Sequence, residues 1–176
     1  MQKIIVIGGG AAGMMSAIWA AKSGHEVILF ERNEKLGKKL FITGKGRCNF
    51  TNAAADVEDL LNTVTSNKKF MYSGFYGFSN LDVMNFFEEA GLAYKVERGN
   101  RVFPLSDHSS DVIGTLQKKL REYNVDIQLN TRVTDLIIED SICKGVKVNN
   151  KTFLADKVIV ATGGKSYSAT GSSGDG

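Results

Sequence analysis

The sequence of 176 residues has few cysteines, few histidines and no long hydrophobic run. Its two cysteines, Cys48 and Cys143, are far apart and lack metal-ligand spacing, so we expect no metal site and free thiols in a reducing cytoplasm. The apolar run after Met1 has four residues, too short for a signal peptide, and no segment approaches the roughly 20 apolar residues of a membrane span. The net charge of +3 gives no argument for nucleic acid. We expect neither a membrane nor a nucleic-acid partner.

Proline is also nearly absent, with one residue, whereas glycine is abundant, with 19 residues. That combination suits a protein whose backbone lies against a ligand in several places. The apolar fraction of 43% allows a packed core, and the length suits one domain. Residues 172–176 have loop composition directly after a strand pattern, so we expect a fragment of a longer protein.

The most informative glycines follow the first apolar run, Ile4–Ile7. Gly8, Gly10 and Gly13 have the G-x-G-x-x-G spacing of a dinucleotide site. In that motif the first glycine allows a tight turn, the second lets a pyrophosphate approach the backbone, and the third lets the next helix pack against the strand. The N–H groups at the start of that helix then face the phosphates.

The residues around this motif strengthen it. A helix is predicted from Ala11 to about Ser23, where Gly24 ends it, and an apolar strand follows at Val27–Phe30. The strand ends at Glu31, where a carboxylate can accept hydrogen bonds from both hydroxyls of an adenosine ribose. A buried βαβ unit without a ligand is the alternative interpretation, which this context disfavours.

Two further segments combine glycine with polar groups. Thr43–Asn49 reads Thr-Gly-Lys-Gly-Arg-Cys-Asn and offers backbone N–H groups, a hydroxyl, a guanidinium and an amide, which suit an anionic ligand. Lys157–Gly164 is a second buried strand that runs into a glycine turn. We interpret Lys35 and Lys39, in contrast, as solvated side chains.

The remaining pattern predicts helices and strands that complete an α/β domain. The aromatic residues between 70 and 78 favour core or interdomain packing over a substrate wall. The predicted elements are helices within 56–92 and at Ser109–Tyr123, short strands at Tyr94–Val96 and Arg101–Phe103, a parallel strand at Val125–Leu129, and a three-stranded antiparallel meander between Val133 and Leu154.

These motifs together resemble the two-dinucleotide-fold flavoproteins of the glutathione reductase and fumarate reductase type. Within them, the sequence is similar to the family of bacterial FAD-dependent oxidoreductases that includes aminoacetone oxidase and a bile-acid (3-dehydro-steroid) reductase. The Gly-Arg-Cys-Asn segment, Gly46–Asn49, separates that family from other flavoproteins. The other shared motifs are Ile7–Gly13, Glu31-Arg32, Gly37–Leu40, Arg101–Pro104, Ala161–Gly164 and Thr170–Gly176.

The resemblance implies a Rossmann-like FAD-binding domain with a parallel sheet, helices and the meander. Residues 1–176 would be its N-terminal part, and the family's inserted domain and C-terminal return would lie outside this sequence. Those missing parts complete the flavin pocket in the family, so we expect the chain alone to be inactive.

The resemblance also implies a non-covalent FAD, because the histidine that carries covalent flavin in fumarate reductase relatives has no counterpart in residues 41–49. Around the adenosine and pyrophosphate it places Gly8, Gly10, Ala11, Ala12, Gly13, Glu31, Arg32, and the backbone of Val133. Along the pyrophosphate, ribityl chain and flavin it places Lys38, Thr43, Gly44, Gly46, Arg47, Cys48, Asn49, Ala161, Thr162, Gly163, Gly164 and Asp175.

The leading hypothesis is therefore an FAD-dependent oxidoreductase that transfers hydride to or from an unidentified small molecule, such as an amino-ketone or an enone. NAD(P)H is a candidate electron donor, and the oligomeric state is left open. No catalytic acid or base is assigned: His25 and His108 have surface or structural contexts, and we expect Cys48 to fill space rather than act as a redox thiol. Two alternatives stay open, an NAD(P)-dependent dehydrogenase without flavin and a non-catalytic flavin-binding or RNA-associated module.

Overall fold

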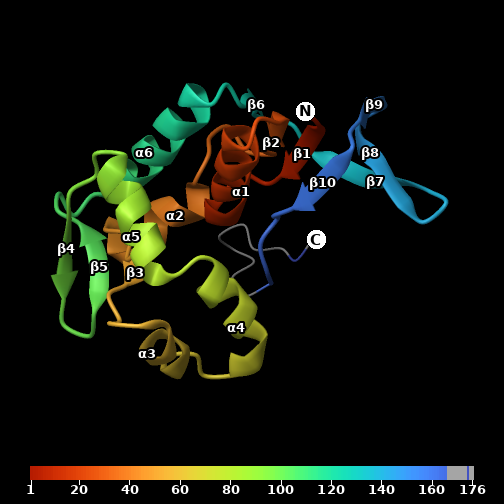
Figure 1. The fold of residues 1–176 in the computed structure, drawn as a ribbon. Helices are drawn as coiled ribbons and strands as arrows, with labels where there is room; N and C mark the ends of the chain where they lie inside the picture. Colours follow the sequence, from red (N-terminus) through yellow and green to blue (C-terminus); the bar gives the residue numbers. More distant parts are fainter. Residues whose placement is uncertain (166–173, 175–176) are drawn as a thin grey trace. The chain divides into compact units, whose positions relative to one another are not determined.

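The computed structural model describes residues 1–165 and residue 174 of the chain, which divides into two compact units (Figure 1). The first unit comprises Met1–Leu40 and Leu116–Gly176, and the second comprises Phe41–Thr115. Two helices, α2 (Lys38–Ile42) and α6 (Ser109–Glu122), occupy the positions along the chain where one unit gives way to the other.

The first unit is built on a four-stranded parallel sheet with the order β10-β1-β2-β6. Its strands are β1 (Lys3–Ile7), β2 (Glu26–Phe30), β6 (Asp126–Gln128) and β10 (Lys157–Val160). Residue Ile7, at the end of β1, is in register with Phe30 on one side and Val160 on the other. The strand order therefore reverses at β1, which makes the carboxyl ends of β1 and β10 the topological switch point of the sheet.

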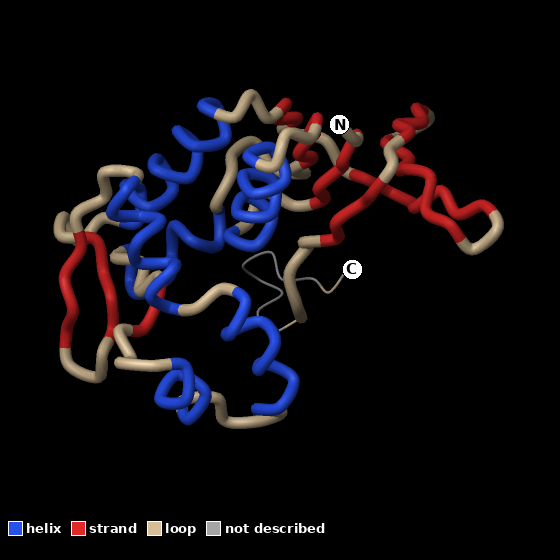
Figure 2. The backbone as a smooth tube through the Cα atoms, in the orientation of Figure 1, coloured by secondary structure: helices blue, strands red, loops and turns tan. Residues whose placement is uncertain are grey.

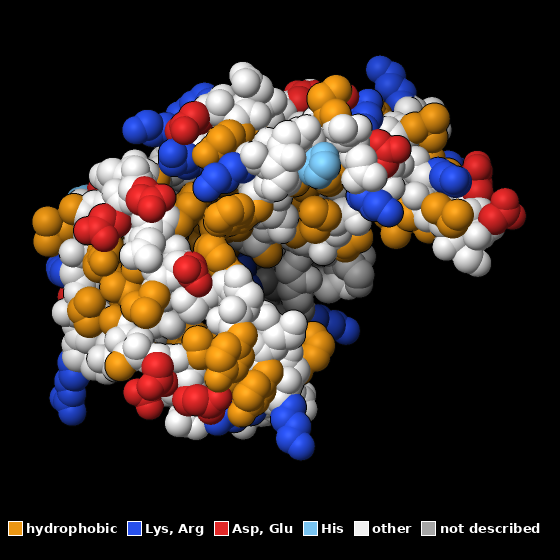
Figure 3. Space-filling view, viewed as in Figure 1, with side chains coloured by type: hydrophobic (Ala, Val, Ile, Leu, Met, Phe, Trp, Pro, Cys, Tyr) orange, Lys and Arg blue, Asp and Glu red, His pale blue; other side chains and the backbone are white. Residues whose placement is uncertain are grey.

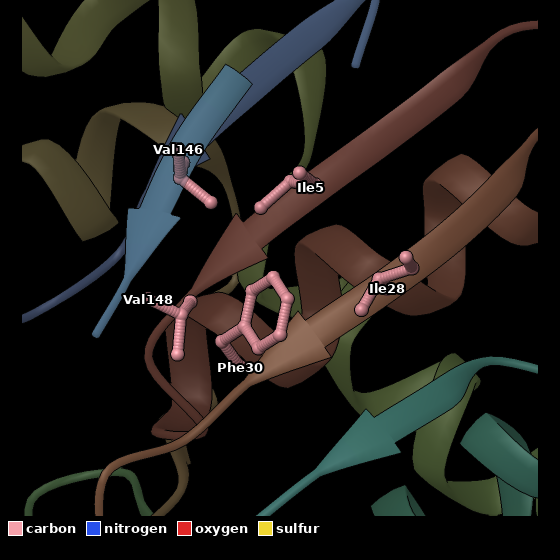
Figure 4. Packing of buried hydrophobic residues seen from close by; sticks show 5 residues of the cluster. All are labelled: Ile5, Ile28, Phe30, Val146 and Val148. Atoms are coloured by element: carbon pink, nitrogen blue, oxygen red, sulfur yellow. The ribbon is translucent and has the colours of Figure 1, made fainter. Parts of the chain in front are cut away.

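Both faces of this sheet are covered, which explains the near-continuous apolar runs of β1 and β2. Helix α1 (Ala11–Lys22) packs against β1 and β2, and Met14, Ala17 and Ile18 are buried. The other face packs against the meander, where the buried residues of both layers point toward one another (Figure 4). This cluster comprises Ile5, Ile28, Phe30, Val146 and Val148.

The antiparallel meander is present where the sequence predicts it. Its strands are β7 (Val133–Glu139), β8 (Ile142–Val148) and β9 (Lys151–Leu154), paired in the order β7-β8-β9. The two connecting turns contain residues with positive φ angles, Asp140 and Ser141 in the first and Asn149 in the second. The predicted Rossmann-like class, with a parallel sheet, helices and antiparallel strands, is thus confirmed.

The second unit combines a small antiparallel sheet with helices, seen in red and blue in Figure 2. The sheet has the order β3-β5-β4, with β3 (Thr51–Asn52), β5 (Arg101–Pro104) and β4 (Tyr94–Glu97). The helical pattern predicted within residues 56–92 forms α3 (Val57–Asn62), α4 (Lys68–Gly77) and α5 (Asn80–Glu89).

Local breaks separate these helices. Asn67 adopts a left-handed conformation with φ +53° before α4, and Phe78 is extended after it. Ser79 then starts α5 with a capping box, in which its side chain accepts from the Asp82 N–H and the Asp82 carboxylate accepts in return. The buried amide of Asn80 donates to the carbonyls of Asn52 and Ala54, which ties α5 to β3.

Helix α4 leaves most of its aromatic side chains exposed at the surface. Phe70 is 85% exposed and Tyr76 is 62% exposed, and hydrophobic groups cover the surface over α4 in Figure 3. No residue of α4 is buried, so its aromatic side chains do not form a core among the residues that the structure describes. Every helix in the described part of the chain is too short or too polar to serve as a membrane span.

We predict that Phe30→Ala lowers the free energy of unfolding by about 3–5 kcal/mol, because it leaves a cavity between the parallel sheet and the meander. Phe30 is 1% exposed and its ring lies edge-on against Phe153, with the centroids 5.1 Å apart. Urea denaturation measures the change. The matched control is Ile138→Ala in β7, where the side chain is 55% exposed and the expected change is within about 0.5 kcal/mol. Equal losses in the two variants would contradict this assignment of the core.

Candidate nucleotide-binding site

The three motif glycines occupy three different environments. Gly8 has φ +106°, and a Cβ added to it would lie 2.5 Å from the carbonyl oxygen of Ala161. A Cβ on Gly13 would collide with the carbonyl oxygen of Gly8. A Cβ on Gly10, in contrast, would meet no atom within 4 Å. Gly8 and Gly13 therefore allow close packing of the chain on itself, whereas Gly10 borders open space.

That open space lies at the N-terminus of α1. Gly10 is the N-cap residue, with φ −80° and ψ −171°, and no described side chain caps the helix there. The first turn carries no acidic residue, and Ala11 and Ala12 are exposed. The N–H groups and the positive end of the helix dipole are thus available to an anion such as a phosphate.

The carboxylate of Glu31 lies beside this turn, at the end of β2. It is 8% exposed and accepts three hydrogen bonds from residues that the structure describes. The Gly9 N–H donates to Oε2 at 2.6 Å, while the backbone N–H and the side-chain amide of Asn33 donate to Oε1 at 2.8 Å and 2.6 Å. These bonds compensate for the burial of the carboxylate and fix it next to the motif.

Neighbouring backbone holds the residues after β2 in place. Gly37 N–H donates to the carbonyl of Gly9, and Thr131 N–H donates to the carbonyl of Glu31. Thr131 precedes Val133, whose side chain packs against the core of the first unit. The segment leading into the meander thus lies beside the end of β2, where the resemblance places the adenine.

The turn after β10 also borders the glycine motif. Ala161 N–H donates to the carbonyl of Ile7 at 2.9 Å, which places Ala161 next to Gly8. Gly163 has φ +83°, so the chain turns sharply after the strand. Thr162 is half-buried, and Gly163 and Gly164 are exposed. The carboxyl ends of β1 and β10 therefore meet at the switch point, where nucleotides bind in open α/β sheets.

Lys38 is linked to the Glu31 carboxylate through the side chain of Asn33. Its ammonium lies 3.1 Å from Glu34 Oε2 and 3.4 Å from Asn33 Oδ1. Arg32, the neighbour of Glu31, is half-buried. Asp175, the last predicted cofactor residue, lies outside the described residues.

The predicted segment Thr43–Asn49 belongs to the second unit, where it forms a tight turn rather than an extended loop. Its first part is the 3-10 helix η1 (Thr43–Gly46), and Gly44, Lys45 and Gly46 all have positive φ angles between 55° and 85°. The N–H groups of Arg47 and Cys48 donate back to the carbonyls of Gly44 and Thr43. Internal hydrogen bonds thus shape the turn. They occupy two of the backbone N–H groups that the sequence analysis assigned to a ligand.

Arg47 makes contacts within the second unit that the sequence did not indicate. Its Nε donates to Asp107 Oδ1 at 2.8 Å, and both terminal nitrogens bond to the Glu97 carboxylate. The guanidinium lies over the ring of Phe103, 4.1 Å from its centroid, and Lys95 Nζ pairs with Asp107 at 2.5 Å. These contacts give Arg47 a structural role, and its contact with the cofactor stays a prediction.

The next two residues also have partners inside this unit. Cys48 is fully buried, and burial raises the pKa of its thiol, as expected for a residue that fills space. The side-chain oxygen of Asn49 accepts from the Val102 N–H at 3.1 Å and so ties the segment to β5. The side chains of Arg47 and Asn49 thus both anchor the segment within the second unit.

Two residues near the site escaped the sequence analysis. Gly9 stands at a variable position of the motif, yet a Cβ there would collide with the Leu36 side chain and approach Glu31. Asn33 bonds to Glu31 through both its backbone and its side chain. The only available signal for Asn33 was its position two residues after the strand-end carboxylate.

A family model described as the HI0933-like protein Rossmann domain matches residues 2–176. The chain belongs to this HI0933-like family. The match confirms the family resemblance that the sequence motifs predicted.

The HI0933-like chain is similar to curated proteins along nearly its whole length. It is 37% identical over 185 aligned positions to a 3-dehydro-bile acid delta(4,6)-reductase of Clostridium scindens, covering 100% of this chain and 42% of that protein. It is 29% identical to a ribosomal RNA dihydrouridine synthase of Escherichia coli, covering 96% and 41%. The chain thus spans about two fifths of the length of these relatives.

Solved structures share the fold at low identity. A 3-ketosteroid delta1-dehydrogenase from Sterolibacterium denitrificans aligns with a TM-score of 0.72 at 16% identity, covering 93% of this chain and 48% of that one. A flavocytochrome c3 fumarate reductase aligns with a TM-score of 0.64 at 24% identity, covering 93% and 34%. These likenesses support the Rossmann-like architecture.

We predict that Gly13→Ala lowers the free energy of unfolding by about 1–3 kcal/mol, because its Cβ would push α1 away from the Gly8 carbonyl. The matched control is Gly114→Ala within α6, where an added Cβ meets no atom within 4 Å. That control should raise the free energy of unfolding by about 0.5–1 kcal/mol, as replacing a mid-helix glycine does. Chemical denaturation compares the two, and a stable Gly13→Ala variant would contradict the close approach.

We also predict that the Arg47 cluster makes stability depend on pH. Hydrogen bonding to Arg47 lowers the pKa of Glu97, and hydrogen bonding to Lys95 and Arg47 lowers the pKa of Asp107. Because both folded-state pKa values lie below the unfolded ones, the stabilisation is fully present above the ordinary carboxyl pKa of about 4. It is lost as the pH falls through the lowered values.

Arg47→Gln should therefore be less stable than the unmodified chain at neutral pH, with a difference that shrinks between about pH 5 and pH 2. Denaturation curves recorded across this range provide the measurement. A difference independent of pH would show that the ion cluster does not contribute through these carboxylates.

Proposed function

We propose that the HI0933-like chain is the FAD-binding part of an FAD-dependent oxidoreductase. The observation that carries this proposal is the pairing of the helix N-terminus at Gly10, which no described side chain caps, with the buried Glu31 carboxylate. The first group suits a pyrophosphate and the second suits an adenosine ribose. The name of one relative supports FAD: the chain is 31% identical, over 91% of its length, to an FAD-dependent monooxygenase of Aspergillus versicolor.

The residues of the first unit fit the adenosine and pyrophosphate groups of FAD. The open space at Gly10 leaves room for a phosphate, which the Cβ of another residue would enter. A carboxylate has about four acceptor positions, and the described donors, on Gly9 and Asn33, use three of them, which leaves capacity for a ribose hydroxyl. When bound, FAD supplies the hydride chemistry, and the chain binds and orients it.

Lys38 and the turns at 43–49 and 161–164 are the proposed contacts for the rest of the cofactor, with Arg32 and the backbone of Val133 near the adenine. In the turn at 43–49, Gly44 offers exposed backbone. Arg47 and Asn49 would act by holding that turn, since their side chains bond to the second unit.

We infer further that the substrate carries a carbon–carbon double bond conjugated to a carbonyl. The names of two relatives share that chemistry: a 3-dehydro delta(4,6)-reductase saturates double bonds conjugated to an oxo group, and dihydrouridine synthesis saturates a double bond conjugated to a uracil carbonyl. A bound reduced flavin would supply the hydride for such a bond, and a proton would complete its saturation. NAD(P)H is the proposed donor that reduces the flavin.

The second candidate places this bond in RNA rather than in a small molecule. The exposed aromatic rings of α4, together with the exposed Lys69, are groups that stack on bases and pair with phosphates. The bound flavin of the full-length protein, once reduced, distinguishes the candidates. Reoxidation by a steroid enone supports the small molecule, and reoxidation by a uridine-containing RNA supports the second candidate.

We predict that Gly10→Ser weakens FAD binding roughly ten- to hundred-fold while leaving the fold intact. The backbone of Gly10 already has N-cap dihedral angles, so a serine there can cap α1 and keep or raise its stability. The serine hydroxyl would occupy the N–H groups and space that the phosphates need. Flavin fluorescence titration measures the affinity, with Gly114→Ser as the control.

Unchanged FAD affinity in Gly10→Ser would contradict the proposed phosphate site. A chain that binds NAD but not FAD would instead select the dehydrogenase without flavin. Denaturation of both serine variants separates a loss of affinity from a loss of folding.

A further inference from the structure

The side chain of Asn33 adds a second hydrogen bond to the Glu31 oxygen that its backbone N–H already contacts. Its Nδ2 lies 2.6 Å from Glu31 Oε1, the same oxygen that accepts from its own backbone N–H. The Gly9 N–H bonds to the other oxygen, Oε2. Donors on both sides therefore set the rotation of the carboxylate about its final bond.

A charged neighbour fixes the direction of the Asn33 amide. The Lys38 ammonium lies 3.4 Å from Asn33 Oδ1, and Glu34 Oε2 holds that ammonium at 3.1 Å. An ammonium can only donate, and an ionised carboxylate can only accept. The amide thus satisfies both neighbours in one orientation alone, with its oxygen toward Lys38 and its nitrogen toward Glu31.

The turn that carries Asn33 does not depend on this side chain. Asn130 N–H donates to the carbonyl of Asn33 at 3.0 Å, and the backbone of Glu31 bonds to Gln128 and Thr131. These contacts are all made by the main chain, so they persist when the amide is removed. The amide is consequently available for a role beyond holding the turn.

We propose that Asn33 is a positioning residue for adenosine recognition, which acts by orienting the Glu31 carboxylate toward the ribose hydroxyls. It holds the buried Glu31 carboxylate in one orientation between the donors of Gly9 and Asn33. This inference rests on the proposed function, because it takes the adenosine end of FAD as the ligand.

The test compares FAD with its analogue that contains 2′-deoxyadenosine, using flavin fluorescence titration of the unmodified chain and of Asn33→Ala. The unmodified chain should prefer FAD roughly ten-fold, as expected for one hydrogen bond to a charged group. Asn33→Ala should bind FAD roughly five- to ten-fold more weakly, and its preference for FAD should fall to about two-fold. If Asn33 only supported the fold, its replacement would weaken the binding of both ligands by the same factor.

A double-mutant cycle identifies the route of the effect. In a Glu31→Ala background, removing the Asn33 side chain should change FAD affinity by less than about two-fold, because the group that it orients is gone. The control is Asn85→Ala on α5, where the side chain is exposed and FAD affinity should be unchanged. Thermal unfolding of each variant without ligand confirms that the first unit is folded.

Each outcome is decisive. Retention of the full preference for FAD in Asn33→Ala overturns the positioning role and leaves the proposed function standing. An equal effect of Asn33→Ala with and without Glu31 overturns it as well. An unmodified chain that binds neither ligand overturns the proposed function, and the inference fails with it.

Discussion

The close approach of α1 to the end of β1 is the constraint on which the rest of the first unit depends. The Gly8 carbonyl occupies the position that a Cβ of Gly13 would need, so the helix can start against the strand only if residue 13 is glycine. This contact brings the helix N-terminus to the switch point of the sheet, beside the turn after β10. The geometry of the proposed phosphate site is therefore a direct consequence of backbone packing.

Glu31 depends on that packing in turn. A carboxylate that is 8% exposed needs hydrogen-bond donors, and the turn supplies one of them through the Gly9 N–H. Gly9 can take this place because a larger residue would meet Leu36 and Glu31 itself. The glycine turn thus serves the proposed nucleotide twice, by exposing N–H groups at its end and by fixing the acid beside it.

The sequence allowed the prediction of the strand, the glycine turn, the helix and Glu31 because these features are local. Strand, turn, helix and strand follow one another within the first 31 residues, and each has its own pattern. The partners of Arg47 could not be predicted in this way, since Glu97 and Asp107 lie 50 and 60 residues further along the chain. Asn33 was missed for a different reason: asparagine after a strand is typical of turns, and only the geometry shows which acceptor its amide meets.

The two units hold their proposed cofactor contacts by different means, which differ in their sensitivity to salt and acid. In the first unit, main-chain packing fixes the glycine turn, and neutral donors bond to the one buried acid beside it. In the second unit, the turn at 43–49 is tied down by an ion cluster whose side chains are partly exposed. Salt and acid weaken exposed ion pairs but hardly affect close packing. Salt and acid should therefore loosen the 43–49 turn before they disturb the packing of Gly13 against Gly8.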